Sequence, residues 1–354
     1  MKLLVTLDFP PAVGGIQKYL YGIVRFMYTA RDQVMVAGVT PPCRRYPEIT
    51  ASLRYYNSPL ARINRKLSLF RLIVPYIQVV RKNPTDLSVE CGNIYAAFLP
   101  WLLSGIIRKP YTVYTYGTEL LGLFSPSPKS SILKRILYKA EKVYTLGEYS
   151  RGILRDLRVT SPVETVPPRL VKLPAKSEKK GRIADTCTIL SVGRLVKHKG
   201  QANLIKAAAQ LAEENRYRFR IVGSGPEYTR LQSLCGEMGV EECVTILHNL
   251  SDNELEDEFN RADIFVLASR ELPEGTEGFG IVLLEAMARY IPVIASASGG
   301  IPEVLDNGRC GVLVEPDNVD ALVKAIREVA NGPSLVETLV AKAYERVVAH
   351  YVWR

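Results

Sequence analysis

Short runs rich in β-branched and aromatic residues alternate with helical patterns along nearly the whole chain. The runs have the usual length of strands, and the segments between them are long enough for helices. Strands are expected at Lys2–Leu7, Gln33–Val39, Leu87–Glu90, Tyr111–Tyr116, Val143–Leu146, Thr188–Val192, Arg218–Val222, Val244–Leu247, Ile264–Ala268 and Pro292–Ala295. This alternation is typical of βαβ units, so it predicts an α/β fold built on parallel sheets.

One segment interrupts the alternation and predicts a domain boundary. Residues 171–185 read VKLPAKSEKKGRIAD, a stretch rich in Lys and polar residues without periodicity, as is typical of an interdomain linker. We expect a first domain over residues 1–172, a linker over 173–185 and a second domain over 186–354, each a doubly wound, Rossmann-like sheet. Since ligands of such sheets bind at the carboxyl ends of the strands, the site is expected in a cleft between the two domains.

The composition narrows the class of protein. The longest apolar stretch, residues 96–107, is shorter than the roughly 18 residues of a membrane span, and the apolar start of the chain stops at Asp8, which argues against a signal peptide. The six cysteines have no Cys-x-x-Cys spacing, and with three histidines they form no zinc pattern. We therefore predict a cytoplasmic protein without a metal site.

The charge is distributed unevenly between the two halves. Residues 1–170 contain 24 Lys and Arg against 10 Asp and Glu, a net +14, whereas residues 171–354 contain 22 against 26, a net −4. A one-sided positive charge indicates an anionic partner for the first half: nucleic acid, an anionic membrane surface or an acidic acceptor. A merely soluble basic surface is the alternative.

A basic segment with helical periodicity follows residue 60. LARINRKLSLFRLIVPYIQVVRK, residues 60–82, places apolar residues at 60, 63, 67, 70, 74 and 77 and a proline at 75, which should kink or divide the helix. The spacing favours a helix packed on the first sheet, and the alternative is a helix lying on a membrane surface.

Two carboxylates flank a glycine hinge near the end of the second domain. In EGTEGFGIVLLEAMA, Glu277 precedes Gly278-Phe279-Gly280, and Glu285 is the only charge of the apolar helix expected from Ile281 to Ala288. A carboxylate in such a helix requires hydrogen-bond donors, from an arginine in the core or from a ligand.

Two further loops follow predicted strands in this half. Gly193-Arg194 and Lys197-His198-Lys199-Gly200 come after one strand, where Arg194 and Lys199 suit a diphosphate beside a helix N-terminus, unless they are solvated loop cations. Gly223 and Gly225 follow the next strand, but they do not complete a dinucleotide fingerprint.

Taken in order, these segments resemble the donor-binding half of family 4 retaining glycosyltransferases. The resemblance rests on Gly193-Arg194 with Lys199-Gly200, Ile221–Pro226, Ala262–Leu267, Glu277–Gly280 with Glu285-Ala286, and Gly299–Glu303. The first half is similar more loosely, through Phe9-Pro10 and Gly14-Gly15. The resemblance implies the GT-B architecture, in which two Rossmann-like domains face each other across a cleft.

The resemblance also implies roles for individual residues. Glu285 would accept hydrogen bonds from the ribose hydroxyls of a nucleotide donor, Glu277 would lie against the transferred sugar, and Arg194 with Lys199 would bind the diphosphate. The remaining donor-binding positions would be Gly14, Gly15, Gly193, Gly223, His248, Leu250, Gly278, Phe279, Gly280 and Ile281. No Asp-x-Asp motif is present, and the family implies no cofactor and no required metal.

Three positions depart from the pattern or stay open. Tyr116 stands where many relatives have a histidine near the reacting carbon, and a tyrosine, which titrates near 10, does not replace imidazole as an acid or base. Glu119 either contacts the acceptor or caps the next segment. His248 stands where relatives often have glycine beside the nucleotide base.

The predicted function is therefore that of a metal-independent, retaining glycosyltransferase. It would move a sugar from a nucleotide-diphosphate donor, with GDP-mannose favoured over a UDP-hexose, to a hydroxyl of a lipid-linked or saccharide acceptor, with the inner membrane face as a possible location and no nucleic acid as partner. The main alternative is a catalytically degenerate module that binds a nucleotide sugar. An epimerase of the same fold would need acid and base groups in the cleft, and the sequence offers no candidates for them. A nicotinamide oxidoreductase is also disfavoured, because the sequence has no glycine fingerprint near its N-terminus.

Overall fold

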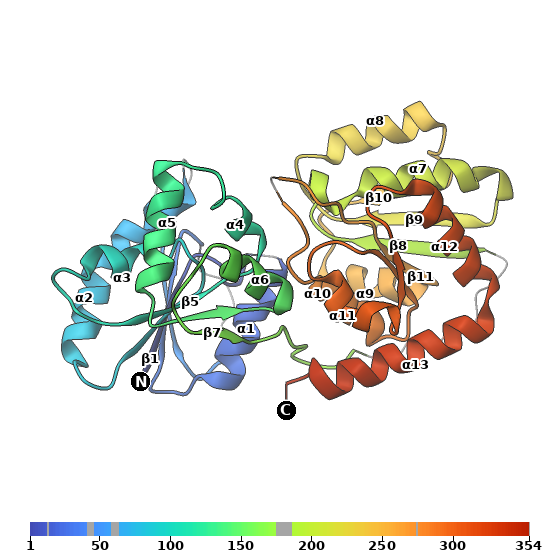
Figure 1. Cartoon of the computed structure of the whole chain (residues 1–354). Coiled ribbons are helices and arrows are strands. Elements are labelled where there is room, and N and C mark those ends of the chain that lie inside the picture. Colours follow the sequence, from blue (N-terminus) through green and yellow to red (C-terminus); the bar gives the residue numbers. More distant parts are fainter. Residues whose placement is uncertain (13, 41–45, 58–63, 175–185, 274, 354) are drawn as a thin grey trace. The chain divides into compact units, whose positions relative to one another are not determined.

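The computed structural model describes residues 1–354 except 13, 41–45, 58–63, 175–185, 274 and 354. Its contacts divide the chain into two compact units (Figure 1). The first comprises Met1–Arg169 with Trp353, whose ring stacks on Phe26 at a centroid distance of 5.2 Å, and the second comprises Leu170–Val352. Most of the predicted linker, residues 175–185, lies outside the described residues, so the predicted domain limits stay a prediction.

The first unit contains a seven-stranded parallel sheet in the order β3-β2-β1-β4-β5-β6-β7. The strands are β1 (Lys2–Thr6), β2 (Gln33–Ala37), β3 (Ser52–Tyr56), β4 (Ser88–Cys91), β5 (Tyr111–Tyr114), β6 (Lys142–Thr145) and β7 (Val163–Thr165). The strand order reverses between β1 and β4, and the crevice outside their carboxyl ends is where doubly wound sheets usually bind ligands.

Six α-helices and one 3₁₀ helix of the described residues connect these strands. They are α1 (Gly15–Met27), η2 (Arg65–Leu72), α2 (Ile73–Lys82), α3 (Phe98–Leu103), α4 (Thr118–Leu121), α5 (Pro128–Lys139) and α6 (Glu148–Asp156). One core cluster joins Leu3 and Val5 of β1 to the buried sides of α2, α3, α5 and α6. Helix α5 begins at a capping box in which Ser127 and Ser130 exchange hydrogen bonds, which satisfies backbone groups left open at a helix start.

The second unit contains a six-stranded parallel sheet in the order β10-β9-β8-β11-β12-β13. The strands are β8 (Cys187–Val192), β9 (Tyr217–Val222), β10 (Val244–Leu247), β11 (Ile264–Leu267), β12 (Val293–Ser296) and β13 (Val312–Val314). Every residue of β11 and β12 is buried, as expected for parallel strands covered by helices on both faces. Here the order reverses between β8 and β11.

Helices cover both faces of the second sheet (Figure 1). They are η3 (Lys197–Lys199), α7 (Gln201–Leu211), η4 (Ala212–Glu214), α8 (Tyr228–Met238), α9 (Asp252–Arg261), α10 (Ile281–Met287), α11 (Ile301–Val304), η5 (Asp306–Gly308), α12 (Val319–Asn331) and α13 (Pro333–His350). Side chains of α7, α8 and α12 share one core cluster with β8. Figure 1 draws α9, α10 and α11 on the opposite side of the strands.

All ten predicted strands are confirmed, with ends that differ by a few residues. The analysis of the sequence missed β3, β7 and β13. Strands β7 and β13 have only three residues each, and none of the five residues of β3 is buried. Such short or solvated edge strands lack the continuous apolar run that identifies a central parallel strand.

The prediction that the segment of residues 60–82 packs as a helix on the first sheet is confirmed for its described part, but the predicted apolar stripe is only partly right, and its members Leu60 and Ile63 lie outside the described residues. The helical segment is divided into η2 and α2 ahead of Pro75, as the proline indicated, and Ile77 of the stripe packs partly buried against the core. The fully buried apolar side chains, however, are Leu69, Leu72, Tyr76, Val79 and Val80. Two members of the predicted stripe point to solvent: Phe70 is 52% and Val74 is 61% exposed. The 3₁₀ geometry of η2 turns about three residues per turn rather than 3.6, so the spacing of an α-helix does not apply there.

None of the described helices combines the length and the apolar character that crossing a membrane requires.

Candidate functional site

The candidate residues of the second unit lie in loops at one edge of its sheet. Arg194 and Lys199 follow β8, Gly223 follows β9, His248 and Leu250 follow β10, and the segment from Glu277 follows β11. Because all six strands are parallel, these loops emerge at their carboxyl ends. The structure therefore brings together residues that are more than 80 positions apart in the sequence.

Arg194 and Lys199 differ in their surroundings. The side chain of Arg194 is exposed, while its backbone carbonyl accepts a hydrogen bond from Gln201 Nε2 at 3.0 Å, which ties the loop to the start of α7. Lys199 is largely buried, and its ammonium group forms an ion pair with the carboxylate of Glu277. This pair spans the point where the strand order reverses between β8 and β11.

Close backbone packing holds these loops in place. A Cβ atom on Gly223 would lie 1.8 Å from the carbonyl oxygen of Gly193, so only glycine allows the two loops to approach. The amide of Gly300, after β12, donates to the carbonyl of Glu277 at 2.9 Å. The loops that carry Arg194 and Glu277 are therefore fixed by main-chain contacts, which favours a preformed site.

The segment after Glu277 turns sharply into α10. Gly280 has a φ of 88°, a left-handed conformation that side chains other than glycine rarely adopt, and it is the N-cap of the helix. Phe279 is buried against Tyr351, with ring centroids 5.7 Å apart, while Gly278 and Ile281 complete the turn. The turn thereby fixes the direction in which α10 leaves the edge of the sheet.

Glu285 lies one helical turn into α10, in a partly exposed position. The neighbouring guanidinium of Arg289 donates to the backbone carbonyl of Glu285 at 2.7 Å and pairs with the carboxylate of Glu256. The arginine nearest in sequence is therefore engaged with another carboxylate.

His248 and Leu250 lie beyond β10. His248 is exposed, and its ring lies 4.7 Å from the ring of Tyr228, centroid to centroid, at an interplanar angle of 48°. Leu250 is partly exposed. Together they present an aromatic and an apolar surface at this corner of the sheet, a combination suited to the flat face of a nucleobase.

In the first unit, Gly14 and Gly15 begin α1 directly after the loop that follows β1. Gly14 is the N-cap of the helix, with a φ of 156°, and its carbonyl accepts the first helical hydrogen bond, from the amide of Lys18 at 3.1 Å. The pair therefore lies at the carboxyl edge of the first sheet, as expected from its place after a strand.

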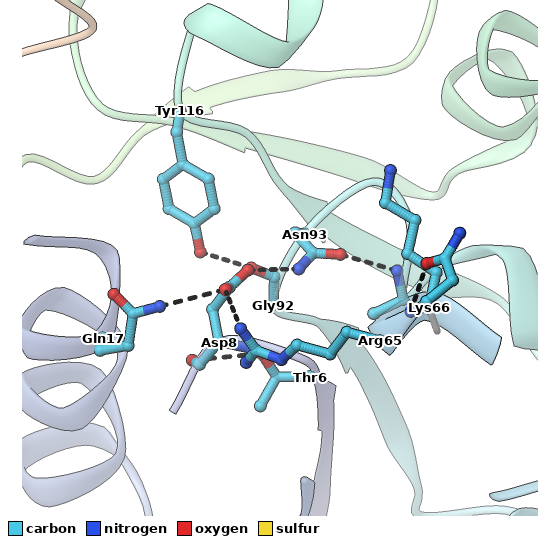
Figure 2. Close-up of polar contacts among 10 residues, drawn as sticks. Thr6, Asp8, Gln17, Arg65, Lys66, Gly92, Asn93 and Tyr116 are labelled. Carbon is cyan, nitrogen blue, oxygen red and sulfur yellow. Dashed lines mark hydrogen bonds and ion pairs between the residues drawn. The ribbon is translucent and has the colours of Figure 1, made fainter. Parts of the chain in front are cut away.

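Analysis of the sequence missed Asp8, which lies at the centre of a polar cluster at this edge (Figure 2). Its carboxylate accepts hydrogen bonds from Gln17 Nε2 at 3.1 Å and from Asn93 Nδ2 at 2.5 Å, and Arg65 Nη1 lies 3.8 Å away. Asp8 follows β1 and Asn93 follows β4, so their hydrogen bond crosses the point where the strand order reverses. A carboxylate at the end of the first strand, where the apolar run stops, was the signal in the sequence.

Tyr116 lies two residues after the end of β5, in the same cluster. Its hydroxyl donates a hydrogen bond to the carbonyl of Gly92, and its ring packs edge-on against Tyr19 with centroids 6.0 Å apart. Burial raises the pKa of the Tyr116 hydroxyl well above its ordinary value. The hydroxyl therefore stays protonated and its hydrogen is committed to the main chain.

Glu119 turns back toward the residue at the end of the strand. Its carboxylate accepts a hydrogen bond from the backbone amide of Tyr116 at 2.6 Å, so the side chain fills the capping role that was one of its two expected uses. Loss of solvation raises the pKa of the Glu119 carboxyl to about 7, although hydrogen bonds from the backbone act in the opposite direction.

This raised pKa predicts a pH dependence of stability. Because folded Glu119 holds its proton more tightly than the unfolded chain does, its contribution is complete below about pH 4.5 and is lost as the pH rises toward 7. Thermal unfolding from pH 4.5 to 7.5 should therefore show a decline that is smaller in Glu119→Gln, which keeps the acceptor for the Tyr116 amide. Parallel curves for the two proteins would contradict the assignment.

Among the residues that the structure describes, no group of three or more His, Cys, Asp or Glu side chains is arranged to hold a metal ion.

Comparison with known proteins places these loops in a family. Residues 174–346 match the family described as Glycosyl transferases group 1. Over 99% of its length the chain is 28% identical to the GDP-mannose-dependent alpha-(1-6)-phosphatidylinositol monomannoside mannosyltransferase of Mycolicibacterium smegmatis, covering 95% of that protein.

Solved structures are similar over both units. Sucrose-phosphate synthase from Thermosynechococcus elongatus matches with a TM-score of 0.83 at 22% identity, covering 99% of this chain and 95% of that one. Anabaena HepE, in complex with UDP and glucose, matches with a TM-score of 0.81 at 18% identity, covering 99% and 96%. These similarities identify the fold as GT-B, in agreement with the expectation from the sequence.

The family match covers the loops that carry Arg194, Lys199, Glu277 and Glu285, and the structural similarity extends to the first unit. Residues 174–346 are therefore a group 1 glycosyltransferase domain, within a chain that has the GT-B fold.

Proposed function

We propose that this glycosyltransferase transfers mannose from GDP-mannose to a hydroxyl of a glycolipid, with retention of the anomeric configuration and without a metal ion. The observation that carries the proposal is the ion pair of Lys199 with Glu277 beside Arg194, at the reversal point of the second sheet. The choice of donor and acceptor follows the mycobacterial relative, whose name specifies GDP-mannose and phosphatidylinositol monomannoside.

The proposed donor site assigns the two cations to the diphosphate. The exposed side chain of Arg194 can bind two phosphate oxygens, and Lys199 supplies a point charge held in place by Glu277. As the bond between the anomeric carbon and the diphosphate oxygen breaks, the bonding electrons stay on the diphosphate, and the two cations stabilise the growing charge. Glu285 accepts hydrogen bonds from the ribose hydroxyls.

In the proposed chemistry the acceptor oxygen bonds to the anomeric carbon on the face that the leaving group vacates. The proton of the acceptor hydroxyl passes to an oxygen of the departing diphosphate. Tyr116 then needs no acid or base function, and it serves by holding the end of β5 against Gly92. Asp8, which is held by Asn93 and Gln17, is positioned to accept a hydrogen bond from the acceptor, and Glu119 supports this edge as a cap.

Transfer in the presence of a chelator tests the proposal. We expect GDP-mannose and a short-chain mannosylated phosphatidylinositol to give an α-linked product, seen by NMR of the anomeric proton, at the same rate with and without EDTA. Glu285→Ala should raise the KM for GDP-mannose about tenfold through the loss of the ribose contact. A β-linked product, or a rate that EDTA abolishes, would remove retention or metal independence from the proposal.

A nucleotide-sugar-binding module without turnover remains the second candidate, favoured by the commitment of the Tyr116 hydroxyl to Gly92. In the same assay this candidate predicts selective GDP-mannose binding and no product with any mannosylated acceptor.

We further propose that the first unit attaches to an anionic membrane surface through η2 and α2. Phe70 and Val74 are exposed apolar side chains, and Lys66 and Arg71 flank them on the same segment. Apolar insertion combined with basic side chains is the usual mode of interfacial helices.

Sedimentation with vesicles tests this attachment. The chain should bind vesicles that contain anionic lipid at low salt, and Phe70→Ser with Val74→Ser should weaken binding about tenfold because these two apolar side chains no longer insert. Met238→Ser, which removes an exposed apolar side chain of α8, is the matched control. Binding that is absent even at low salt would refute the attachment.

A further inference from the structure

Two lysines from different helices converge on one aromatic ring next to the Asp8 cluster. The ammonium group of Lys66, on η2, lies 3.4 Å from the centroid of the Tyr95 ring, and that of Lys129, on α5, lies 5.6 Å from the same centroid. Both distances are measured from one point, so the two ammonium groups are at most about 9 Å apart.

The described residues hold no carboxylate that pairs with either of these two lysines. Arg65, the neighbour of Lys66, has Asp8 at 3.8 Å, so its charge is balanced. Within the described part of the chain, neither Lys66 nor Lys129 has a carboxylate within ion-pair distance. Like charges held near one another repel, so the arrangement indicates a binding partner of negative charge.

Helix stability does not explain the positions of these lysines. Lys66 and Lys129 lie in the first turns of η2 and α5, and neither first turn contains an acidic residue. Cations stabilise the C-terminal end of a helix and are unfavourable at its N-terminal end. By contrast, Lys82 and Lys139 end α2 and α5, where a cation is favourable, so they serve as natural controls.

The Tyr95 ring lies close in sequence to Asn93, which holds the Asp8 carboxylate proposed to contact the acceptor. Tyr95 follows Asn93 by two residues, and Asn93 donates to Asp8 across the reversal point of the first sheet. Asn93 Oδ1 also accepts a hydrogen bond from the amide of Ala96 at 2.7 Å, which fixes the segment that carries the ring. Figure 2 draws Lys66 next to Arg65, whose guanidinium lies 3.8 Å from the carboxylate of Asp8.

We propose that Lys66 and Lys129, on the base formed by Tyr95, bind the phosphate group of the acceptor, with the acceptor hydroxyls directed toward Asp8 and Asn93. Each ammonium group can donate to its own phosphate oxygen at about 2.8 Å, so that a tetrahedral phosphate bridges the two. The inference rests on the proposed function for the identity of the acceptor as a glycosylated phospholipid. Binding of a phosphodiester headgroup at this position does not depend on it.

The test compares two water-soluble acceptors below their micelle concentrations, so that no membrane surface is present. One is a short-chain mannosylated phosphatidylinositol and the other is an alkyl mannoside without phosphate. For Lys66→Ala with Lys129→Ala, the KM for the phosphorylated acceptor should rise at least tenfold, the value expected from losing one to two charge-assisted hydrogen bonds. The KM for the alkyl mannoside, the kcat and the acceptor-free release of GDP should be unchanged.

Lys82→Ala with Lys139→Ala removes the same charge from the C-terminal ends of α2 and α5 and should leave both KM values unchanged. An equal rise for both acceptors, an equal effect of the control variant, or no rise at all would overturn the proposal.

A binding measurement separates this inference from the proposed function. Mannosylated glycerophosphoinositol, the deacylated headgroup, is titrated into the full chain and followed by NMR. If no acceptor is mannosylated, headgroup binding that is lost in Lys66→Ala with Lys129→Ala still supports the subsite, and binding that is unaffected by the variant, or absent, overturns it. Inorganic phosphate is titrated in parallel. If it binds as tightly as the headgroup, the site recognises free phosphate, and the assignment to the acceptor is wrong.

Discussion

Lys199→Ala is expected to lower kcat by about 100- to 1,000-fold. The substitution removes one of two cations from the proposed diphosphate site and leaves the largely buried carboxylate of Glu277 without its ion-pair partner. Both changes oppose the build-up of negative charge on the leaving group, and an unpaired carboxylate would also repel it. The effect should therefore be larger on kcat than on the affinity for GDP.

Steady-state kinetics at saturating acceptor, with GDP affinity measured by calorimetry, would check this expectation. Lys206→Ala is the matched control because Lys206 is an exposed cation on α7 of the same unit. Lys199→Met with Glu277→Gln would remove both charges, and it should remain as slow as Lys199→Ala if the cation itself is required. If the kcat of Lys199→Ala stays within threefold of that of the unsubstituted enzyme, Lys199 does not stabilise the leaving group.

Gly200→Ala is expected to destabilise the second unit by about 3 kcal/mol. Gly200 has a φ of 69°, and a Cβ atom there would lie 1.7 Å from the carbonyl oxygen of Ala268 at the end of β11. The substitution therefore adds backbone strain to a main-chain collision, and the loop that carries Lys199 has to move away from the sheet. Weaker GDP-mannose binding should accompany the loss of stability.

Gly239→Ala separates the effect of backbone strain from that of the collision with the main chain. Gly239 has a similar φ of 65°, but no heavy atom lies within 4 Å of its Cβ position, so the expected cost is only about 1 kcal/mol of strain. Thermal unfolding followed by circular dichroism would rank the two variants. Equal shifts of Tm would show that backbone strain alone explains the loss of stability in Gly200→Ala. The loops after β8 and β11 would then move apart without a measurable loss of stability.

Local sequence was sufficient for most of the fold. The central strands were predictable because parallel strands buried on both faces are continuous apolar runs, such as Ile264–Leu267. Strands β3, β7 and β13 could not be predicted, because an edge strand owes its conformation to the neighbour with which it pairs. The exposure of Phe70 and Val74, two members of the stripe in residues 60–82, was not predicted for a related reason: a fixed period does not show the change from 3₁₀ to α geometry at Leu72.

The donor-side candidates were also accessible from the sequence. Arg194, Lys199, Glu277 and Glu285 each follow a strand, and the order of strand, glycine turn and helix brings such residues to one edge of a parallel sheet. The pairing of Lys199 with Glu277 was not predictable, because it joins residues 78 positions apart.

The sequence by itself determined the α/β class, the two sets of parallel strands and the types of side chain at the carboxyl edge of the second sheet, since periodicity and turn residues act over short distances. Only the tertiary structure decided the environment of each group. It joined Asp8 to Asn93, committed the Tyr116 hydroxyl to Gly92, and brought Lys66 and Lys129 to one ring. These contacts join segments far apart in the chain, and such neighbours depend on strand order and helix packing rather than on the residues adjacent in sequence.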